Sequence, residues 1–268
     1  MRFTLIDILK IERRVIMTSK TPYGTVLIKA SRILDILSST DKPLTLNQIA
    51  VDTELTNSTA LKILDTLQLI GYVQKDEDTK RYSLGPAIIK YAYKAINHLE
   101  IKHLAEPHLK KLHDITKETI HLGIQSDNHI IYVLKIESTN PIKLYSQIGK
   151  SIPLYCSAMG KAILADQKDS QIYSYLQNNK LLKFTENTIT SKKAFLNEIR
   201  RIREQGYAFD NCEHEEDVFC VGASISVNGK NFGAFSVSVP KYRLTNQFLD
   251  EIINAVLECR NQIISDLQ

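Results

Sequence analysis

The sequence contains no tryptophan and only four cysteines among its 268 residues. The cysteines stand at scattered positions that form neither a CxxC pair nor a regular framework: Cys156, Cys212, Cys220 and Cys259. A disulfide scaffold is therefore not expected, and a reduced, cytoplasmic setting fits best. Cys212 and His214 lie close together with Cys220 near, but a fourth well-spaced ligand is missing. We therefore expect no metal site.

The first residues also lack the continuous apolar run of a targeting or membrane segment. In MRFTLIDILKIERRVI the acidic residues Asp7 and Glu12 interrupt the apolar positions, and no small-residue cleavage site follows. We expect neither a signal peptide nor an association with a membrane. Residues 1–20 are interpreted as an N-terminal extension, either a genuine arm or the product of a translation start placed too early.

A large charge excess is missing as well. The chain has 34 Lys and Arg against 30 Asp and Glu, a formal net charge of +4 and a pI near 8.7. Between residues 21 and 90 the basic and acidic residues are equal in number. No basic field indicates a nucleic-acid partner, so any such inference depends on the order of the expected elements. The hydrophobic content of 43% is enough for two domains with cores of their own.

A helix-turn-helix pattern occupies residues 45–70. Thr45 and Gln48 form a capping-box signal, after which Leu46, Ile49 and Ala50 share one helical face. The next helix is expected to turn these residues inward: Ala60, Leu61, Leu64 and Leu67. An earlier helix over residues 25–37 is expected to bury Val26, Ile33, Leu34 and Leu37. The opening turn of the second helix would present polar groups to the edges of DNA bases, and these are Asn57, Ser58, Thr59 and Lys62.

A wing follows this helix. Gly71 ends it, and residues 72–74 and 81–84 are expected to pair as strands around the polar tip 75–80. Lys80 and Arg81 are candidates for phosphate contacts. Residues 21–85 therefore predict a winged helix-turn-helix DNA-binding domain. The alternative is a small helical domain that docks on another protein.

Residues 86–100 predict a linker helix with an unusually wide apolar face. Its stripe consists of Ile88, Ala92, Ala95 and Leu99, with Ile89, Tyr93 and Ile96 beside it. Such a stripe needs a partner. We expect a homo-oligomer in which the same helix of a second subunit covers it, with packing against its own chain as the alternative.

Residues 101–268 alternate strand and helix signals without βαβ regularity. A helix over residues 103–117 is expected to be interrupted by Pro107, and a hairpin joins residues 119–125 to 130–137. Further strands are expected at residues 142–149, 207–211, 219–227 and 232–239, the last two joined at Asn228 and Gly229. Ser191 and Thr245 cap two more helices. The fold class is therefore α+β, with a mostly antiparallel sheet.

A small-anion site is expected where serines meet a helix start. Ser236 and Ser238 alternate with apolar residues along one strand, and the segment CSAMGKA would expose free N–H groups at Ala158 and Met159, a natural seat for a carboxylate. Asp210 would repel a carboxylate, so it should accept from ligand hydroxyls instead. The alternative is that the serine face simply meets water.

Enzyme chemistry is not expected. Gly160 and Lys161 lack the preceding glycine of a phosphate loop, so no nucleotide or other cofactor is expected. Cys156 and Cys220 have no local signature of a cysteine hydrolase. A small-molecule enzyme or sensor whose helical domain mediates association remains the alternative function.

Two segments resemble the IclR (isocitrate lyase regulator) family of bacterial transcription factors: SIPLYCSAMGKAILA and GYAFDNCEHEEDVFCVGASISVNGKNFGAFSVSVP. The resemblance covers nearly everything from about residue 25 onward. It implies a winged helix-turn-helix that binds a palindromic operator, a dimerising linker helix and a GAF/PAS-like effector domain for small organic acids. Carried over by motif, the ligand contacts are Ala158, Met159, Asp210, Cys220, Ser236 and Ser238, with Leu144, Ile152 and Val218 as apolar lining.

Within that family the chain looks most like the regulators of pectin and hexuronate breakdown that respond to 2-keto-3-deoxygluconate. The segments that carry this resemblance are TKETIHLG, KLYSQIGKSIPLYCSAMGKAILA and REQGYAFDNCEHEE, and Tyr155 stands where many members have His. Lys62 stands where the family usually has Arg. Since Lys cannot form a bidentate fork, the contact of Lys62 with DNA departs from the family pattern. The resemblance implies a repressor that responds to a hydroxylated keto acid.

Overall fold

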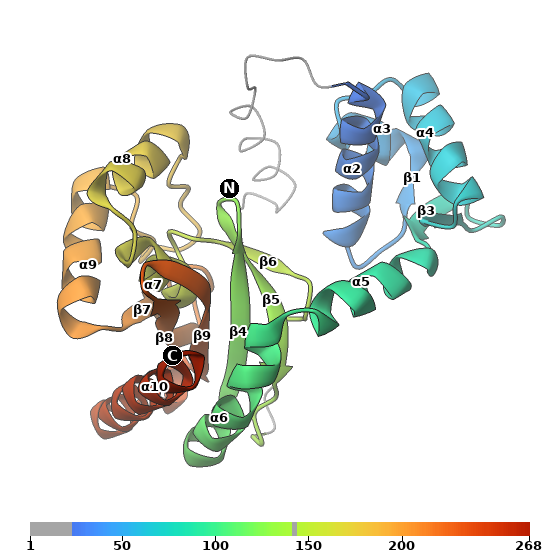
Figure 1. Cartoon of the computed structure of the whole chain (residues 1–268). Helices are drawn as coiled ribbons and strands as arrows, with labels where there is room; N and C mark the ends of the chain where they lie inside the picture. Colours follow the sequence, from blue (N-terminus) through green and yellow to red (C-terminus); the bar gives the residue numbers. More distant parts are fainter. Residues whose placement is uncertain (1–22, 141–143) are drawn as a thin grey trace. The chain divides into compact units, whose positions relative to one another are not determined.

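The computed structural model describes residues 23–140 and 144–268, which form two compact units divided between His98 and Leu99 (Figure 1). The expected N-terminal extension at residues 1–20 lies outside the described residues. Each unit has its own apolar core. Within the described residues, no helix combines the length and apolar character needed to cross a membrane.

The described part of the first unit, residues 23–98, contains four helices and a small antiparallel sheet with strand order β1-β3-β2. The helices are α2 (Thr25–Ser38), α3 (Leu46–Asp52), α4 (Asn57–Leu69) and α5 (Ala87–Asn97). The strands are β1 (Leu44–Thr45), β2 (Val73–Lys75) and β3 (Arg81–Leu84). Ile33, Ile49 and Leu64 are fully buried where α2, α3 and α4 meet. This is the expected winged helix-turn-helix.

Local signals set the ends of these helices. The side chain of Thr45 accepts from the Gln48 N–H, and Gln48 returns a bond to the Thr45 N–H, so the predicted capping box is confirmed. Thr56 caps α4 through the N–H of Thr59. Gly71, with φ of 75°, takes the left-handed conformation that lets the chain turn away from α4 into the wing.

Two expected inward positions are wrong. Leu61 is 38% exposed, and Ile63 is buried in its place. Successive helical residues are separated by about 100°, so Leu61 lies to one side of the face that contains Ala60, Leu64 and Leu67. Val26 is 54% exposed although it lies on the correct face of α2, because the first two turns of that helix extend beyond the elements that cover Ile33.

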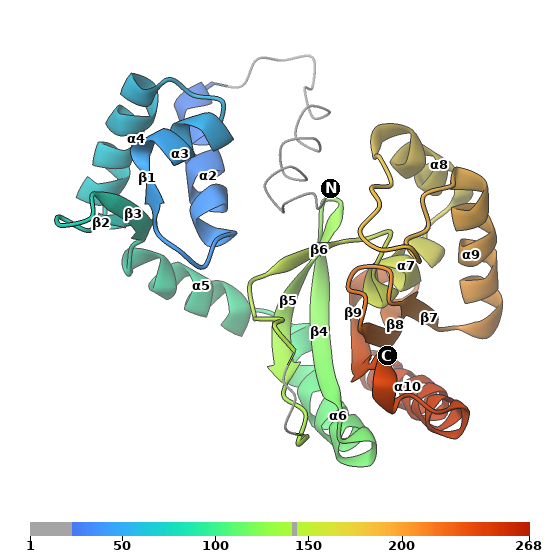
Figure 2. The same ribbon diagram turned by 180° about the vertical axis from the view of Figure 1, so that it is seen from behind.

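The second unit contains a six-stranded, fully antiparallel sheet with order β6-β5-β4-β9-β8-β7 (Figure 2). Its strands are β4 (Thr119–Ser126), β5 (His129–Ile136), β6 (Ser151–Pro153), β7 (Ala208–Asn211), β8 (Val218–Val227) and β9 (Lys230–Pro240). Helices α6 (Glu100–Thr116) and α10 (Asn246–Leu267) cover one face. Helices α7 (Ala158–Ala165), α8 (Asp169–Asn178) and α9 (Lys192–Gln205) lie over the other. The α+β class is confirmed.

Strand alternation decides which residues face which layer. Phe235, Val237 and Val239 of β9 point into the core beneath α6 and α10. Ser236 and Ser238 therefore point to the side of α7, and both are only 3% exposed. The alternative that the serine face meets water is wrong, because α7 and the neighbouring loops cover it.

Two expectations for this unit are corrected, and one helix was not expected. Helix α6 runs without a break through Pro107, whose apolar neighbours Ala105 and Leu109 are fully buried and hold the helix in place despite one missing N–H. The sequence signal missed α8 entirely. The strand expected at residues 142–149 does not form over its described part, residues 144–149, where Lys135 Nζ donates to the carbonyls of Leu144 and Ser146 at 2.8 and 2.7 Å instead.

Candidate functional site

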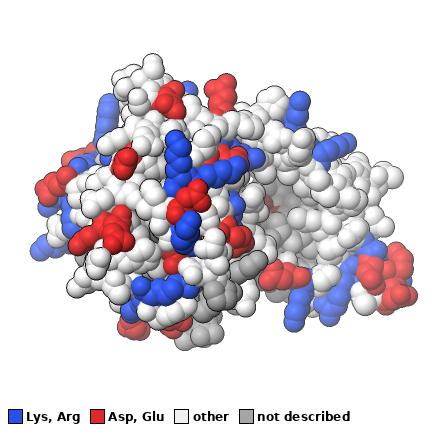
Figure 3. All heavy atoms as spheres, turned by 90° about the horizontal axis from the view of Figure 1, so that it is seen from below, with Lys and Arg blue, Asp and Glu red and all other residues white. Residues whose placement is uncertain are grey.

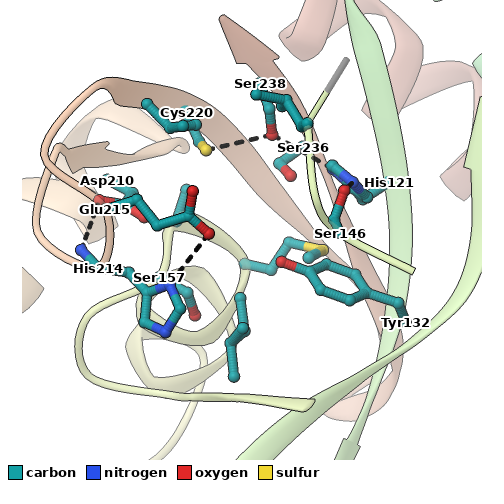
Figure 4. A pocket seen from close by; sticks show the side chains of 15 residues that line it. His121, Tyr132, Ser146, Ser157, Asp210, His214, Glu215, Cys220, Ser236 and Ser238 are labelled. Carbon is teal, nitrogen blue, oxygen red and sulfur yellow. Dashed lines mark hydrogen bonds and ion pairs between the residues drawn. The ribbon is translucent and has the colours of Figure 1, made fainter. Parts of the chain in front are cut away.

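A small cavity of about 40 Å³ lies in the second unit between the serine face of the sheet and the start of α7 (Figure 4). Fifteen residues line it. They include all nine ligand contacts expected from the sequence: Leu144, Ile152, Ala158, Met159, Asp210, Val218, Cys220, Ser236 and Ser238. The structure also adds residues that the sequence analysis missed, which are His121, Tyr132, Ser146, Ser157, His214 and Glu215. We call this cavity the cup.

The start of α7 supplies the floor of the cup. The Ser157 hydroxyl donates to the Pro153 carbonyl at 2.9 Å and accepts from the Gly160 N–H at 3.1 Å, which fixes the first turn. The N–H groups of Ala158 and Met159 precede the first intrahelical bond, and neither has a hydrogen-bond partner among the described residues. Two parallel N–H donors at a helix start favour an anion.

Strands β8 and β9 supply the serine wall. Cys220 lies opposite Ser238 in the ladder and Gly222 lies opposite Ser236. The Cys220 thiol and the Ser238 hydroxyl are 3.2 Å apart. A side chain at Gly222 would approach the Ala158 side chain to 3.0 Å, so glycine there allows the start of α7 to sit directly on the strand. The anion-binding floor and the hydroxyl wall are thereby brought together.

Asp210 of β7 is the buried carboxyl of the cup. Its Oδ1 accepts from the Glu213 N–H at 2.7 Å and from the His214 N–H at 3.4 Å. Burial raises the pKa of Asp210 to about 7, and the nearby Glu213 adds to the shift. Near neutral pH the carboxyl therefore exists in both protonation states, and its Oδ2 has no hydrogen-bond partner among the described residues.

The remaining polar groups of the cup carry no positive charge. Burial lowers the pKa of His121 to about 3 and that of His214 to about 4, so both imidazoles are neutral. Glu215, at the rim, has a pKa raised by partial burial. Among residues 23–140 and 144–268 no Lys or Arg lines the cup, so within this part of the chain the groups that can hold an acid are backbone N–H groups and hydroxyls.

The Cys and His residues that lie close together in the sequence do not converge on one point in the structure. Cys212, which the sequence placed near His214 and Cys220, is buried in the core beneath α10. Within residues 23–140 and 144–268, no three His, Cys, Asp or Glu side chains converge in a way that would hold an ion.

The helix-turn-helix places its candidate DNA contacts on one exposed turn. Asn57, Ser58 and Lys62 are exposed at the start of α4 and Thr59 is half-buried, with its Oγ1 2.9 Å from Thr56 Oγ1. In the wing, Lys80 pairs with Glu77 at 3.0 Å. An exposed pair of this kind is weak, so Lys80 can exchange its partner for a phosphate.

Arg81 has a different environment from Lys80. Its Nη1 donates to the Pro43 carbonyl at 3.0 Å, which ties the wing to the chain that precedes α3. Arg81 is therefore a structural support for the wing as well as a candidate phosphate contact. On the face of the molecule shown in Figure 3, basic and acidic side chains are interspersed, in agreement with the small net charge of the whole chain.

Comparison with known proteins assigns both units. The IclR helix-turn-helix domain model matches residues 26–77, and the model of the C-terminal part of bacterial IclR transcriptional regulators matches residues 93–265. The HTH-type transcriptional regulator KdgR of Escherichia coli (strain K12) is 30% identical over 228 residues, which cover 85% of this chain and 86% of the relative. The DNA-binding transcriptional repressor YiaJ of the same organism is 31% identical over 263 residues, covering 96% and 93%.

A solved structure agrees with these relatives. The crystal structure of Thermotoga maritima IclR superimposes with a TM-score of 0.69 at 30% identity, covering 91% of this chain and 99% of the other. The first unit is thus a helix-turn-helix domain that binds DNA and the second an effector-binding domain. The chain belongs to the IclR family of bacterial transcriptional regulators.

Proposed function

We propose that this protein is a repressor whose affinity for a palindromic operator changes when a small hydroxylated keto acid binds the cup. 2-Keto-3-deoxygluconate is the first compound to test. The observation that carries the proposal is the division of the cup into two ends. Donors lie at the start of α7 and on the serine wall, and a buried carboxyl lies at Asp210.

The donor end suits the carboxylate of the effector. The N–H groups of Ala158 and Met159 lie at a helix start, where the backbone dipole favours negative charge. Ser236 and Ser238 add hydroxyls that donate to an oxygen anion. These N–H and O–H groups can bind an anion through hydrogen bonds, without a positively charged side chain in contact with it.

The acidic end suits the hydroxyls of the effector. A carboxylate oxygen at Asp210 accepts from a hydroxyl, and the bond favours the ionised form of a group whose pKa is otherwise about 7. Glu215 supplies a second acceptor at the rim. Pyruvate has no hydroxyl, so it leaves both acceptors unpaired.

The comparisons support this choice over the alternative of an enzyme or sensor whose helical domain only mediates association. Both relatives described above are DNA-binding regulators, and one is named a repressor. The segments that resemble the regulators responding to 2-keto-3-deoxygluconate include the start of α7 and the loop after Asp210. These are the segments that form the cup.

Calorimetry on the full chain tests the division of roles. The unsubstituted protein should bind 2-keto-3-deoxygluconate more tightly than pyruvate, by about tenfold for one added hydrogen bond to a carboxyl. Asp210→Ala should remove most of that preference. The matched control, Ser236→Ala with Ser238→Ala, should weaken both acids and leave their ratio nearly unchanged.

Two outcomes would contradict the proposal. Tighter binding of pyruvate, or a preference that survives the loss of Asp210, would show that the acidic end does not read hydroxyls. A gel shift with the upstream region of the chain's own gene should give salt-sensitive, sequence-dependent binding that the acid changes. Binding without sequence preference at low salt would favour the association role instead.

A further inference from the structure

Four polar side chains form a continuous hydrogen-bonded row along one wall of the cup (Figure 4). His121 of β4 lies in the middle. Its Nε2 is 2.7 Å from the Ser146 hydroxyl and its Nδ1 is 3.2 Å from the Ser238 hydroxyl. The Cys220 thiol lies a further 3.2 Å beyond Ser238. The row links the loop before β6, strand β4, strand β9 and strand β8.

The imidazole in this row carries a single N–H. His121 is 2% exposed, and burial together with the positive charge of Lys135 lowers its pKa to about 3. A neutral imidazole donates from one nitrogen and accepts at the other. In one of its two contacts His121 therefore donates the hydrogen bond, and in the other it accepts. If the direction of donation along the row is reversed, the imidazole changes from one tautomer to the other.

Each tautomer gives Ser238 a different role. With the proton on Nε2, His121 donates to Ser146 and accepts from Ser238, so the hydroxyl proton of Ser238 is occupied. With the proton on Nδ1, His121 accepts from Ser146 and donates to Ser238. When the Cys220 thiol also donates to Ser238, the proton of Ser238 is free to point into the cup. Only the second arrangement offers Ser238 as a donor to a ligand.

We propose that His121 is a positioning residue for the effector, which passes hydrogen-bond donation from Ser146 to Ser238 so that Ser238 donates to the carboxylate of a bound acid. The inference rests on the proposed function, since it requires an acid in the cup. A carboxylate only accepts hydrogen bonds, so its arrival selects the tautomer with the proton on Nδ1. Every donor in the row then points toward the acid.

Ser146 is held in place to begin this row. Lys135 Nζ donates to the Ser146 carbonyl at 2.7 Å and to the Leu144 carbonyl at 2.8 Å, which fixes the loop against β5. The Tyr132 ring packs beside the imidazole with a centroid distance of 4.7 Å, and this contact orients the ring. Lys135 also pairs with Glu137 at 2.9 Å, so its role here is to hold the loop that carries Ser146.

Two amide substitutions separate the halves of the row. The amide of asparagine reaches the position of Nδ1 and keeps a group beside Ser238, whereas the amide of glutamine reaches the position of Nε2 and keeps a group beside Ser146. His121→Asn should bind pyruvate and 2-keto-3-deoxygluconate within about threefold of the unsubstituted protein, and His121→Gln should bind both about tenfold more weakly. Equal losses in the two variants would indicate a packing role only and overturn the inference.

Nitrogen NMR of the imidazole gives a readout that packing alone does not change. With the histidines labelled at both ring nitrogens, addition of 2-keto-3-deoxygluconate or pyruvate should place the His121 proton on Nδ1. Ser238→Ala should abolish that response, because the link to the acid is lost. A complex in which the proton remains on Nε2 would overturn the inference.

The two measurements also separate this inference from the function on which it rests. If both acids bind but the tautomer or the order of the two variants differs from expectation, the role of His121 is wrong and the proposed function stands. If neither acid binds the unsubstituted protein, the proposed function is wrong, and the role of His121 is overturned with it.

Discussion

At the scale of single residues, Asp210 shows how burial sets the chemistry of a side chain. Its carboxyl accepts two backbone N–H bonds, which lower the pKa, yet burial outweighs them and raises the pKa to about 7. An ordinary Asp ionises near pH 4. The folded protein therefore binds this proton more tightly than the unfolded chain does, and the contribution of Asp210 to stability is greatest at low pH and is lost as the pH rises through about 7.

Asp210→Asn should stabilise the unliganded protein at pH 8, because asparagine keeps the acceptor for the Glu213 N–H and removes the buried charge. We expect a gain in the free energy of unfolding of up to about 4 kcal/mol at pH 8, which shrinks toward zero near pH 4. Urea unfolding followed at both pH values measures this difference. A gain of the same size at both pH values would contradict an ionisation effect.

A buried lysine links helix α7, which forms the donor end of the cup, to the loop that holds Asp210 at the acidic end. Lys161 of α7 is fully buried and bonds Glu213, whose own N–H holds Asp210, while Glu198 of α9 lies 3.6 Å away. The sequence showed Lys161 only as a residue after a glycine. Its partner is 52 positions away, and no local pattern relates two residues at such a separation. Side chains whose role depends on strand pairing or helix docking are the ones that a single sequence does not reveal.

The residues of the cup that the sequence predicted depend on local patterns, whereas the missed residues depend on strand pairing. Ser236 and Ser238 were found because strand alternation is local, and Ala158 and Met159 because a helix start is local. His121 was missed, since it lies in the cup only because β4 pairs with β9 in a register that sets it opposite Ser236. The fold was predictable to the extent that caps and hairpins are local. The strand expected at residues 142–149 does not form over its described part, residues 144–149, where the carbonyls of residues 144 and 146 bond the side chain of Lys135.

At the scale of elements, α7 depends on the absence of a side chain at Gly160. A Cβ at this position would collide with the backbone of Leu154, which runs directly beneath the helix. Gly160→Ala should therefore destabilise the second unit, by about 2 kcal/mol or more, although alanine is the better helix former. Thermal unfolding measures the loss. Gly229→Ala in the exposed β8–β9 turn is the comparison, because a side chain there meets no neighbouring atom and its cost comes only from the left-handed backbone conformation. An unchanged or raised melting temperature in Gly160→Ala would refute this close packing.

Helix α4 is the element expected to read DNA. Lys62→Ala and Ser58→Ala should each weaken operator binding by about 1 to 3 kcal/mol if the side chain contacts a base, and by less if it contacts only phosphate. Both side chains are exposed, so folding and effector affinity should not change. Gel shifts at two salt concentrations, with Gln68→Ala near the other end of α4 as the control, measure the effect. Unchanged operator affinity in both variants would move the reading surface to another element.

At the scale of the whole molecule, α5 has a wide apolar face of which a large part is exposed within the described residues. None of its residues is buried, Ala92 and Ala95 are exposed, and Ile89 and Tyr93 are 68% and 69% exposed. Ile88, Ile96 and Leu99 are half-buried, and Leu99 packs against the core of the second unit, so packing against its own chain accounts for part of the stripe. The exposed part of the stripe on this helix of the DNA-binding unit favours a second copy as its partner, because a two-fold pair of readers matches a palindromic site.

We therefore expect the full chain to be at least a dimer at micromolar concentration, and Ala92→Glu to shift it toward monomer by placing a charge in the middle of the stripe. Lys94→Gln is the matched control, since it changes the net charge by the same amount on the opposite side of α5. Light scattering gives the mass of each form, and gel shifts give operator affinity. If dimers are needed to span both halves of the operator, Ala92→Glu should bind a full operator no more tightly than a half-site, whereas Lys94→Gln should retain the full-site preference. A monomeric unsubstituted protein, or an Ala92→Glu variant that remains a dimer, would assign the interface to another surface.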